Sequence, residues 1–215
     1  MRYDAAIFDL DGTLLDTIDD LKNSINHALS VCGYPPRTRA EVLAFVGNGV
    51  PRLVELAVPP GTPADRRQAV LDAMNAHYAA HCAQLTRPYP GVTDVLRTLR
   101  AAGVRVAVVS NKPDYGVQEL CARYFPGLLD SAVGMREGIR KKPYPDAVEA
   151  ALAAFGVPPE RAVYIGDSEV DVQTAKNAHT ALISVDWGFR THAQLVEAGA
   201  GHIVSDADAL LALLR

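Results

Sequence analysis

The sequence has few cysteines and no cluster of cysteine or histidine residues at metal-ligand spacing. Cys32, Cys82 and Cys121 are far apart and form no CxxC pair, so neither a disulfide framework nor a cysteine-based zinc site is predicted. His77 and His81 have i, i+4 spacing but lack a third ligand, and we interpret them as surface or packing residues. We expect reduced thiols in a cytoplasmic protein. Acidic residues interrupt the first apolar stretch, and no run has the length of a membrane span, so no signal peptide and no membrane partner are predicted.

The chain also lacks an excess of basic residues. Lysine and arginine number 21, aspartate and glutamate number 25, and the formal net charge is −4. A nucleic-acid-binding domain usually carries a basic excess, so nucleic acid is not an expected partner. With 49% hydrophobic and 21% charged residues over 215 positions, the composition is that of a globular protein with one large domain or two small ones. It is compatible with a monomer or a homodimer.

The N-terminal part, after one short strand, has the pattern of a helical domain. Apolar residues recur every three or four positions over residues 16–32, and Gly33 is a typical stop. Residues 38–41 have the form of a capping box before a second helix. A third helix is expected to begin within residues 62–65, where a cap residue precedes proline. The Pro-Tyr-Pro-Gly segment at 88–91 marks the end of this helical region.

The remainder alternates between strand and helix patterns. Such alternation predicts a parallel sheet with helices on both faces, and the N-terminal strand joins it from the other side of the helical segment. We therefore predict the α/β fold class, with a Rossmann-like parallel sheet core and an inserted helical cap. Residues 1–15 plus 88–215 form the expected core domain, and residues 16–87 the helical one. The expected strands are 4–8, 104–109, 131–134, 162–165 and 181–185, and the expected helices are 92–102, 114–124, 146–155, 169–178, 191–198 and one capped by Asp206.

Two carboxylates follow the first strand. Asp9 and Asp11 lie two residues apart, so they share a face of an extended segment, and Gly12 allows a sharp turn just beyond them. In open parallel α/β sheets, ligands bind at the carboxyl ends of the strands. Two carboxylates this close repel each other unless one is protonated or a cation lies between them. The pair therefore predicts acid–base or metal chemistry at this edge of the sheet.

Further polar residues stand at the ends of two other predicted strands and just before a predicted helix. Active sites on such sheets are assembled from these loops. Acidic oxygen ligands suit Mg²⁺, and serine, asparagine and lysine donors around a cation suit a phosphate group. The residues are Ser110, Asn111 and Lys112 after one strand, Lys141, Lys142 and Pro143 before a helix, and Asp167 and Asp171 after another strand.

Four segments, in this order, resemble the motifs of haloacid dehalogenase-like phosphatases. They are Asp9–Thr13 (DLDGT), Val108–Asn111 (VVSN), Lys141–Pro143 (KKP) and Gly166–Asp171 (GDSEVD). The helical segment after the first motif resembles the helical cap of that family, so the resemblance covers essentially the whole chain. It implies a phosphatase with Mg²⁺ as its cofactor and a small phosphorylated metabolite as its partner.

The resemblance also implies a role for each matching residue. Asp9 would be the nucleophile that forms an aspartyl-phosphate, and Asp11 the general acid and then the general base. Asp9, Asp167 and the main-chain carbonyl of Asp11 would hold Mg²⁺. An anionic nucleophile approaches a phosphate dianion only if a metal ion and a lysine cancel the repulsion, which agrees with these roles. The residues implied to bind phosphate are Ser110, Asn111 and Lys142, and Asp171 would orient a metal-bound water or Lys142.

For several of these residues a purely structural role stays open. Asp167 is also placed to cap the helix that follows it, and Asp171 to be a solvated acid one turn into that helix. Ser110 is also typical of a turn at a strand end. Lys141 and Lys142 are adjacent, so only one faces the site; the family pattern selects Lys142. A non-catalytic binding module would show a broken motif, whereas these motifs are complete.

Three segments resemble phosphoglycolate phosphatases within this family. Asn111–Pro113 (NKP) extends the second motif, Phe45–Gly49 resembles a glycine-bearing cap loop, and Asp186–Phe189 resembles a tryptophan–glycine loop. The glycines are also typical of an interhelical turn, and the tryptophan of loop packing. Phosphoglycolate is the expected substrate; sugar phosphates, nucleotides, pyrophosphate and a sugar phosphomutase reaction are the alternatives, although Thr13 is typical of hydrolases. Arg52 is either a ligand for a substrate carboxylate or a solvated helix residue.

Overall fold

The computed structural model describes residues 1–215 and divides the chain into two compact units. One consists of Met1–Asp16 and Pro88–Arg215, and the other of Thr17–Arg87. The first unit contains a six-stranded parallel sheet in the order β5-β4-β1-β6-β7-β8, which confirms the predicted α/β class. Its strands are β1 (Ala5–Phe8), β4 (Arg105–Pro113), β5 (Ser131–Met135), β6 (Ala162–Gly166), β7 (Ala181–Val185) and β8 (Ile203–Val204).

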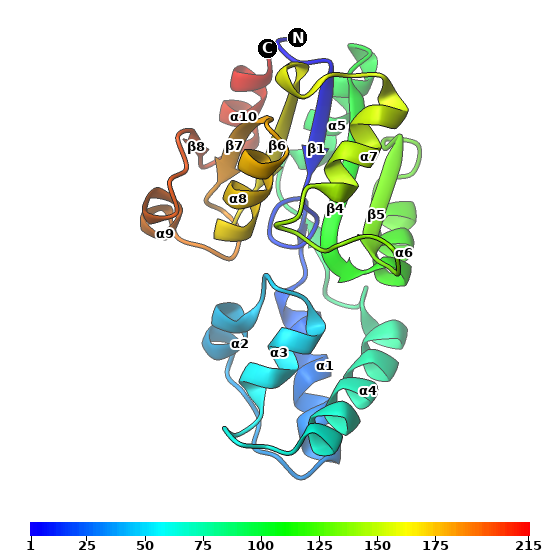
Figure 1. Ribbon diagram of the computed structural model, residues 1–215, viewed down its shortest axis with the longest axis vertical. Coiled ribbons are helices and arrows are strands. Elements are labelled where there is room, and N and C mark those ends of the chain that lie inside the picture. Colours follow the sequence, from blue (N-terminus) through cyan, green and yellow to red (C-terminus); the bar gives the residue numbers. More distant parts are fainter. The chain divides into compact units, whose positions relative to one another are not determined.

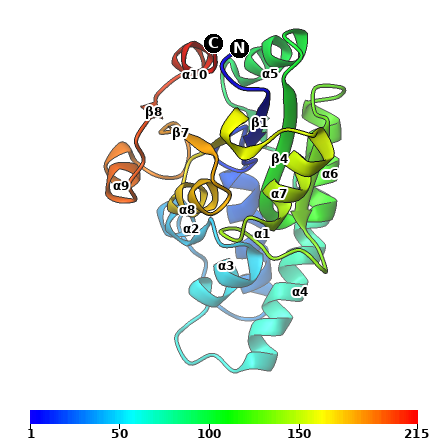
Figure 2. The ribbon, with the colours of Figure 1, turned by 45° about the horizontal axis from the view of Figure 1, so that its top comes forward.

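Helices cover both faces of this sheet (Figures 1 and 2). Helices α7 and α8 lie on one face, and α5, α6 and α10 lie on the other. This is the Rossmann-like arrangement that the alternating pattern predicts. The helices are α5 (Val92–Ala101), α6 (Asp114–Tyr124), α7 (Asp146–Phe155), α8 (Glu169–Asn177), α9 (His192–Glu197) and α10 (Ala207–Leu214), with a 3-10 turn at Pro159–Arg161.

Strand β1 is at the centre of the sheet and is buried along its whole length. A strand with neighbours on both sides and helices on both faces is expected to be uniformly apolar, as Ala5–Phe8 is. Ile7 belongs to the core cluster under α7 and α8, together with Val109 and Tyr164. Residues that directly follow β1 are therefore anchored to a buried strand that is hydrogen-bonded on both sides.

The second unit is helical. Its helices are α1 (Ile18–Val31), α2 (Arg39–Phe45), α3 (Val50–Ala57) and α4 (Ala64–His81). Helices α1 and α4 lie side by side, and their buried apolar residues include Ile25, Met74 and Tyr78. The predicted capping box is confirmed, because Glu41 N donates to Thr38 Oγ1 at 3.2 Å and Thr38 N donates to Glu41 Oε2 at 2.8 Å. None of the helices in the chain has the length and apolar character needed to cross a lipid bilayer.

Several short elements, among them α3, β2, β3 and β8, are absent from the sequence-based prediction. Helix α3 has eight residues, and Pro51 stands in its first turn, where the missing N–H costs no hydrogen bond. Gly49, with a φ of 86°, precedes it as the N-cap. The pair β2 (Leu15–Asp16) and β3 (Arg87–Pro88) has two residues per strand. Strands of two residues contain too few positions to show a periodic pattern, whereas the buried residues Val50, Leu53, Val54 and Ala57 of α3 do have helical spacing, a signal that the sequence-based prediction missed.

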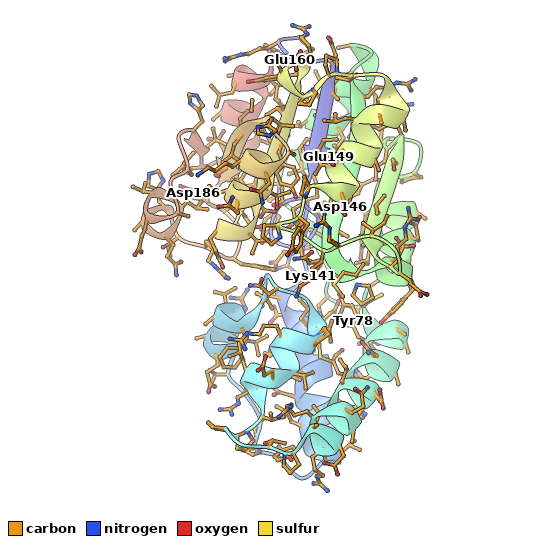
Figure 3. All side chains as sticks on the ribbon, in the orientation of Figure 1. Tyr78, Lys141, Asp146, Glu149, Glu160 and Asp186 are labelled. Atoms are coloured by element: carbon orange, nitrogen blue, oxygen red, sulfur yellow. The ribbon has the colours of Figure 1, made fainter.

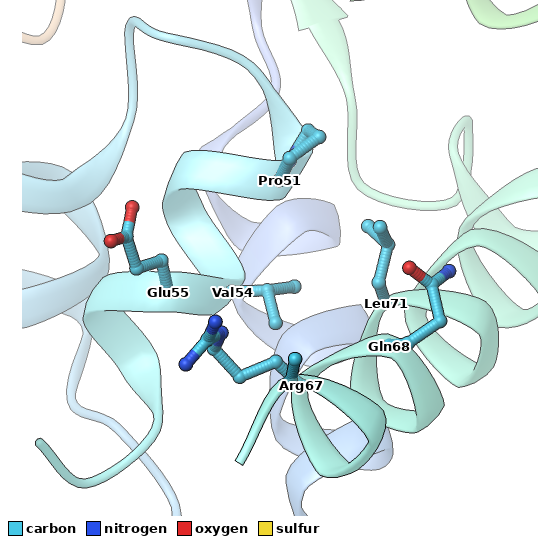
Figure 4. A pocket seen from close by; sticks show the side chains of 7 residues that line it. Pro51, Val54, Glu55, Arg67, Gln68 and Leu71 are labelled. Carbon is cyan, nitrogen blue, oxygen red and sulfur yellow. The ribbon is translucent and has the colours of Figure 1, made fainter. Parts of the chain in front are cut away.

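A hollow of about 400 Å³ lies in the helical unit, and Figure 4 shows side chains that line it. Arg52 lies on α3 nearby and donates Nη1 to Glu55 Oε2 at 2.6 Å. Its side chain is 48% exposed, and ion pairs of this exposure contribute little to stability. Arg52 is thus paired within its own helix, as expected of a solvated helix residue. The lining residues are Pro51, Val54, Glu55, Ala64, Arg67, Gln68 and Leu71.

Candidate active site

The sheet register brings the ends of β1, β4 and β6 to one level. Phe8 pairs with Val108 on one side and with Ile165 on the other. Asp9, the next residue, donates its backbone N–H to Ile165 O at 2.9 Å. Asp167 follows two positions after Ile165. The carboxyl ends of neighbouring parallel strands therefore gather the predicted polar residues at one edge of the sheet.

Strand β4 contains a bulge at the second predicted motif. Between the pairs Val109–Val133 and Pro113–Met135, four steps along β4 match two along β5. The bulge contains Ser110, Asn111 and Lys112, all buried. The prediction that the strand ends at Val109 is wrong, because the chain returns to the ladder at Pro113. A bulge re-aims side chains while the strand continues, which brings these polar residues to the edge of the sheet.

Lys142 is buried among acidic residues. Its Nζ lies 2.9 Å from Asp9 Oδ1 and 2.8 Å from Asp171 Oδ1, and it donates to Tyr164 Oη at 3.1 Å. Burial alone would lower the pKa of Lys142, but the nearby carboxylates of Asp171 and Asp9 outweigh it and raise the pKa well above its usual value. Lys142 is therefore a fixed positive charge. Lys141, which is labelled in Figure 3, is exposed, as the prediction for the lysine pair requires.

Asp171 is fully buried, so the alternative of a solvated acid is excluded. Its Oδ1 faces Lys142, and its Oδ2 accepts from the Ser168 N–H and hydroxyl at 3.1 and 2.6 Å. It also accepts from Asp167 N at 3.2 Å. Gly166 leaves room for it, since an added Cβ would lie 2.3 Å from Asp171 Cβ. Asp171 thus joins the start of α8 to Lys142.

The surroundings of Asp9 and Asp167 raise the pKa of both carboxyl groups. Burial, with Asp171 and Asp11 nearby, raises the pKa of Asp9 to about 7 against the opposing effect of Lys142. Burial, followed by the charges of Asp171 and Asp9, raises the pKa of Asp167 well above its usual value. Carboxylates gathered in this way bind a proton or a cation readily.

The residues present fit a hard divalent cation. Carboxylate oxygens of Asp9, Asp167 and Asp171 lie within 4.8 Å of one another. Both oxygens of Asp171 already accept hydrogen bonds from Lys142 and Ser168. All-oxygen donor sets of this kind suit Mg²⁺.

The side chain of Asp167 is held by Thr13 of the first motif and by Phe189 in the loop that follows β7. Its Oδ1 accepts from Thr13 Oγ1 at 3.0 Å, and its Oδ2 accepts from Phe189 N at 2.7 Å. Trp187 Nε1 donates to Thr13 O at 3.1 Å, which agrees with the packing interpretation of the tryptophan. These bonds join Asp167 to the first motif and not to α8, so the helix-cap alternative is wrong. The contacts of Thr13 and Phe189 with Asp167 were not predictable from the sequence pattern.

Gly188 allows this loop to approach the first motif, and its replacement by alanine is expected to disturb the site. An added Cβ would lie 2.2 Å from Gly12 O and 2.5 Å from Asp167 Oδ2, so the loop must move and weaken the bond from Phe189. We expect a loss of stability of about 1–3 kcal/mol and a loss of phosphatase activity of about 10²-fold. Gly201→Ala is the matched control, since nothing lies within 4 Å of its Cβ position. Thermal unfolding measures the stability of the two variants, and phosphate release measures their activity. Equal values for Gly188→Ala and Gly201→Ala would contradict the role of Gly188 in the approach of this loop.

Asp11 is paired with Lys112, which the sequence places among the polar residues of this edge without indicating its partner. Lys112 Nζ lies 2.9 and 3.1 Å from the two carboxylate oxygens of Asp11. Ser110 Oγ accepts from Lys112 N at 3.3 Å, and Asn111 Nδ2 donates to Lys142 O at 3.1 Å. The signal for Lys112 was the Asn-Lys-Pro sequence, but sequence alone did not show which acid it meets. The edge of the sheet thus contains two buried lysines, one for each acid of the first motif.

The histidine pair lies elsewhere, in the helical unit. The rings of His77 and His81 stack with centroids 4.0 Å apart, and His27 stacks on His77 at 4.2 Å. His77 Nδ1 lies 2.9 Å from Ser24 Oγ. Burial, together with the neighbouring histidines, lowers the pKa of His77. These contacts are those of packing residues, as predicted.

A parallel α/β core with this edge of carboxylates and buried lysines has the architecture of a phosphoryl-transfer enzyme. The sequence model described as haloacid dehalogenase-like hydrolase matches residues 6–185, and the chain belongs to that family. It is a phosphatase, a phosphoric monoester hydrolase of the haloacid dehalogenase-like type.

Relatives match nearly the whole chain. A phosphoglycolate phosphatase of Cereibacter sphaeroides is 38% identical, covering 97% of this chain and 96% of its own length. A crystal structure from Lactobacillus delbrueckii subsp. bulgaricus, provisionally described as a phosphoglycolate phosphatase, is 39% identical with a TM-score of 0.95, covering 100% of this chain and 99% of its own. CbbY from Rhodobacter sphaeroides, solved with xylulose-(1,5)bisphosphate, is 26% identical with a TM-score of 0.75, covering 94% of this chain and 93% of its own.

Proposed function

We propose that the protein hydrolyses 2-phosphoglycolate with Mg²⁺ through an aspartyl-phosphate on Asp9. The observation that carries the substrate is the 38% identity, over nearly the full length of both chains, to a phosphoglycolate phosphatase. The same identity supports a small phosphorylated metabolite as the partner. The buried acids and lysines of the site support the chemistry.

Asp9 is the proposed nucleophile. Its Oδ1 accepts from Leu10 N at 2.7 Å and pairs with Lys142, so we assign the attack on phosphorus to Oδ2. As the Oδ2–P bond forms, the bond from phosphorus to the ester oxygen breaks, and Asp11 donates a proton to that oxygen. Asp11 then takes a proton from a water molecule whose oxygen attacks phosphorus, which releases phosphate and restores Asp9.

The surrounding residues offset the negative charge. Asp9, Asp167 and the carbonyl of Asp11 would hold Mg²⁺, which when bound neutralises phosphoryl oxygens and orients them. Lys142 supplies a further positive charge beside Asp9. Ser110 and Asn111 bind phosphoryl oxygens from the bulge in β4. These roles follow the motif positions, and the buried side chains limit the access of water to the phosphoryl group.

A sugar bisphosphate is the second candidate substrate. CbbY, which is 26% identical to this chain, was solved with xylulose-(1,5)bisphosphate. Its sequence identity is lower than that of the Cereibacter sphaeroides and Lactobacillus delbrueckii proteins described as phosphoglycolate phosphatases, and its TM-score is lower than that of the Lactobacillus delbrueckii structure. We therefore rank the sugar bisphosphate second.

Phosphate release from a panel of esters tests the substrate. The panel contains 2-phosphoglycolate, xylulose-1,5-bisphosphate, other sugar phosphates, nucleoside monophosphates and pyrophosphate. We expect release to peak at 2-phosphoglycolate, to stop with EDTA and to return with excess Mg²⁺. Similar rates across the panel would reject the named substrate while keeping the phosphatase, and a maximum at the bisphosphate would favour the second candidate. Activity that EDTA leaves unchanged would reject Mg²⁺.

A further inference from the structure

The edge of the sheet contains a second buried cation, Lys112, that the proposed mechanism does not use. Its side chain is 2% exposed, and its Nζ contacts both carboxylate oxygens of Asp11 at 2.9 and 3.1 Å. The Asp11 side chain is 18% exposed, so the pair lies at the boundary between the protein interior and solvent. A lysine is rarely buried to this extent unless it is paired.

The local structure is built to place this lysine. The bulge in β4 directs residue 112 out of the ladder. Gly116 on α6 leaves room for its aliphatic part, because an added Cβ would lie 3.3 Å from Lys112 Cε. Gly134 on β5 likewise accommodates the backbone, since an added Cβ would lie 2.7 Å from Lys112 O. Gly116 thus allows the path of the Lys112 side chain, and Gly134 allows the path of the backbone at the same residue.

Lys142 is held by other acids. Its Nζ contacts Asp9 and Asp171 at 2.9 and 2.8 Å and donates to Tyr164. It therefore lies beside the proposed nucleophile. Lys112 lies beside Asp11, which in the proposed function donates a proton to the ester oxygen. The two lysines are thus placed for different parts of one substrate, the phosphoryl group and the leaving group.

We infer that Lys112 recognises a carboxylate carried by the leaving group of the substrate, and that it pairs with Asp11 when no substrate is bound. This inference rests on the proposed function. The ester oxygen must come within hydrogen-bond distance of Asp11, roughly 2.6–3.2 Å, to accept its proton. Lys112 Nζ lies within 3.1 Å of both Asp11 oxygens. In 2-phosphoglycolate a single carbon separates the ester oxygen from the carboxylate, which brings that carboxylate within reach of Lys112.

The inference predicts a selective loss in Lys112→Met. Ethyl phosphate has the same two-carbon leaving group without the carboxylate, so the two esters differ at the group that Lys112 binds. A charged hydrogen bond lost at this point lowers kcat/KM for 2-phosphoglycolate about 10- to 100-fold more than for ethyl phosphate. Lys112→Arg keeps the charge and recovers part of the selectivity. Lys176→Met, an exposed lysine on α8, is the control and leaves the ratio unchanged.

Steady-state kinetics on both esters, with circular dichroism to verify folding, decide the matter. An equal loss on the two esters in Lys112→Met would mean that Lys112 only positions Asp11, and would overturn the inference. Wild-type protein that releases no phosphate from 2-phosphoglycolate would overturn the proposed function and the inference with it. The two outcomes can be told apart because the wild-type protein alone tests the proposed function, whereas the inference is tested by comparing Lys112→Met with the wild type.

A binding measurement provides a readout that does not depend on turnover. In an Asp9→Asn background, calorimetry compares the affinities for 2-phosphoglycolate and for inorganic phosphate with and without Lys112→Met. The inference predicts about 10-fold or more weaker binding of 2-phosphoglycolate and little change for inorganic phosphate. Equal weakening of both ligands would assign Lys112 to the phosphoryl group and contradict its role in recognising the carboxylate.

Discussion

Replacing Asp9 with asparagine is expected to lower phosphate release by on the order of 10⁴-fold or more, while the protein stays folded. Asparagine has nearly the same shape, and its amide oxygen can still accept from Leu10 N, but an amide does not attack phosphorus as a carboxylate does. Single-turnover and steady-state assays with 2-phosphoglycolate measure the loss. Asp72→Asn, an exposed acid on α4, is the control and retains full activity.

Asp9→Asn also tests how the buried charge of Asp9 affects the stability of the folded protein. The pKa of Asp9 is about 7 in the folded protein, compared with 3.8 for an ordinary aspartate. The folded state therefore holds this proton more tightly than the unfolded state, so without Mg²⁺ stability decreases as pH rises from about 4 to 7. Asp9→Asn lacks this contribution, so its thermal midpoint at pH 7 without metal is expected to equal or exceed that of the wild type. If Asp9→Asn retains phosphatase activity, Asp9 is not the nucleophile. If Asp9→Asn unfolds, the buried charge of Asp9 does not lower the stability of the wild type at pH 7.

The central part of the site was predictable from the sequence because it depends on strand ends. Asp9 and Asp167 each closely follow an apolar segment of a buried strand, and parallel strands in register bring such positions together. The burial of Lys142 and the exposure of Lys141 agree with the motif position of the lysine before proline. In each case the pattern within a few residues contains the needed information.

The remaining features depend on contacts between distant segments. Asp11 and Lys112 are 101 positions apart and meet only because β4 contains a bulge, which has no periodic signal. The bond from Phe189 to Asp167 likewise depends on the close approach that Gly188 permits. Tertiary packing determines these features.

Replacing Lys142 with methionine is expected to destabilise the protein and to abolish activity. Methionine keeps much of the volume but leaves Asp9 and Asp171 buried without their cation. Removing one partner of a buried ion pair costs about 3–5 kcal/mol, which lowers Tm by roughly 6–20 °C for a chain of this size. The cost is expected to grow between pH 6 and 8, because protonation of Asp9 relieves the repulsion at the lower pH.

Lys141→Met is the matched control, since it is the same substitution one position earlier on an exposed side chain. Surface substitutions of this kind usually change stability by less than about 0.5 kcal/mol. Thermal unfolding of both variants across that pH range, with and without Mg²⁺, makes the comparison. Mg²⁺ is expected to restore part of the stability of Lys142→Met, because it binds the same carboxylates. If both variants unfold at the same temperature, Lys142 is not the charge that balances these acids, and its proposed role beside the nucleophile is wrong.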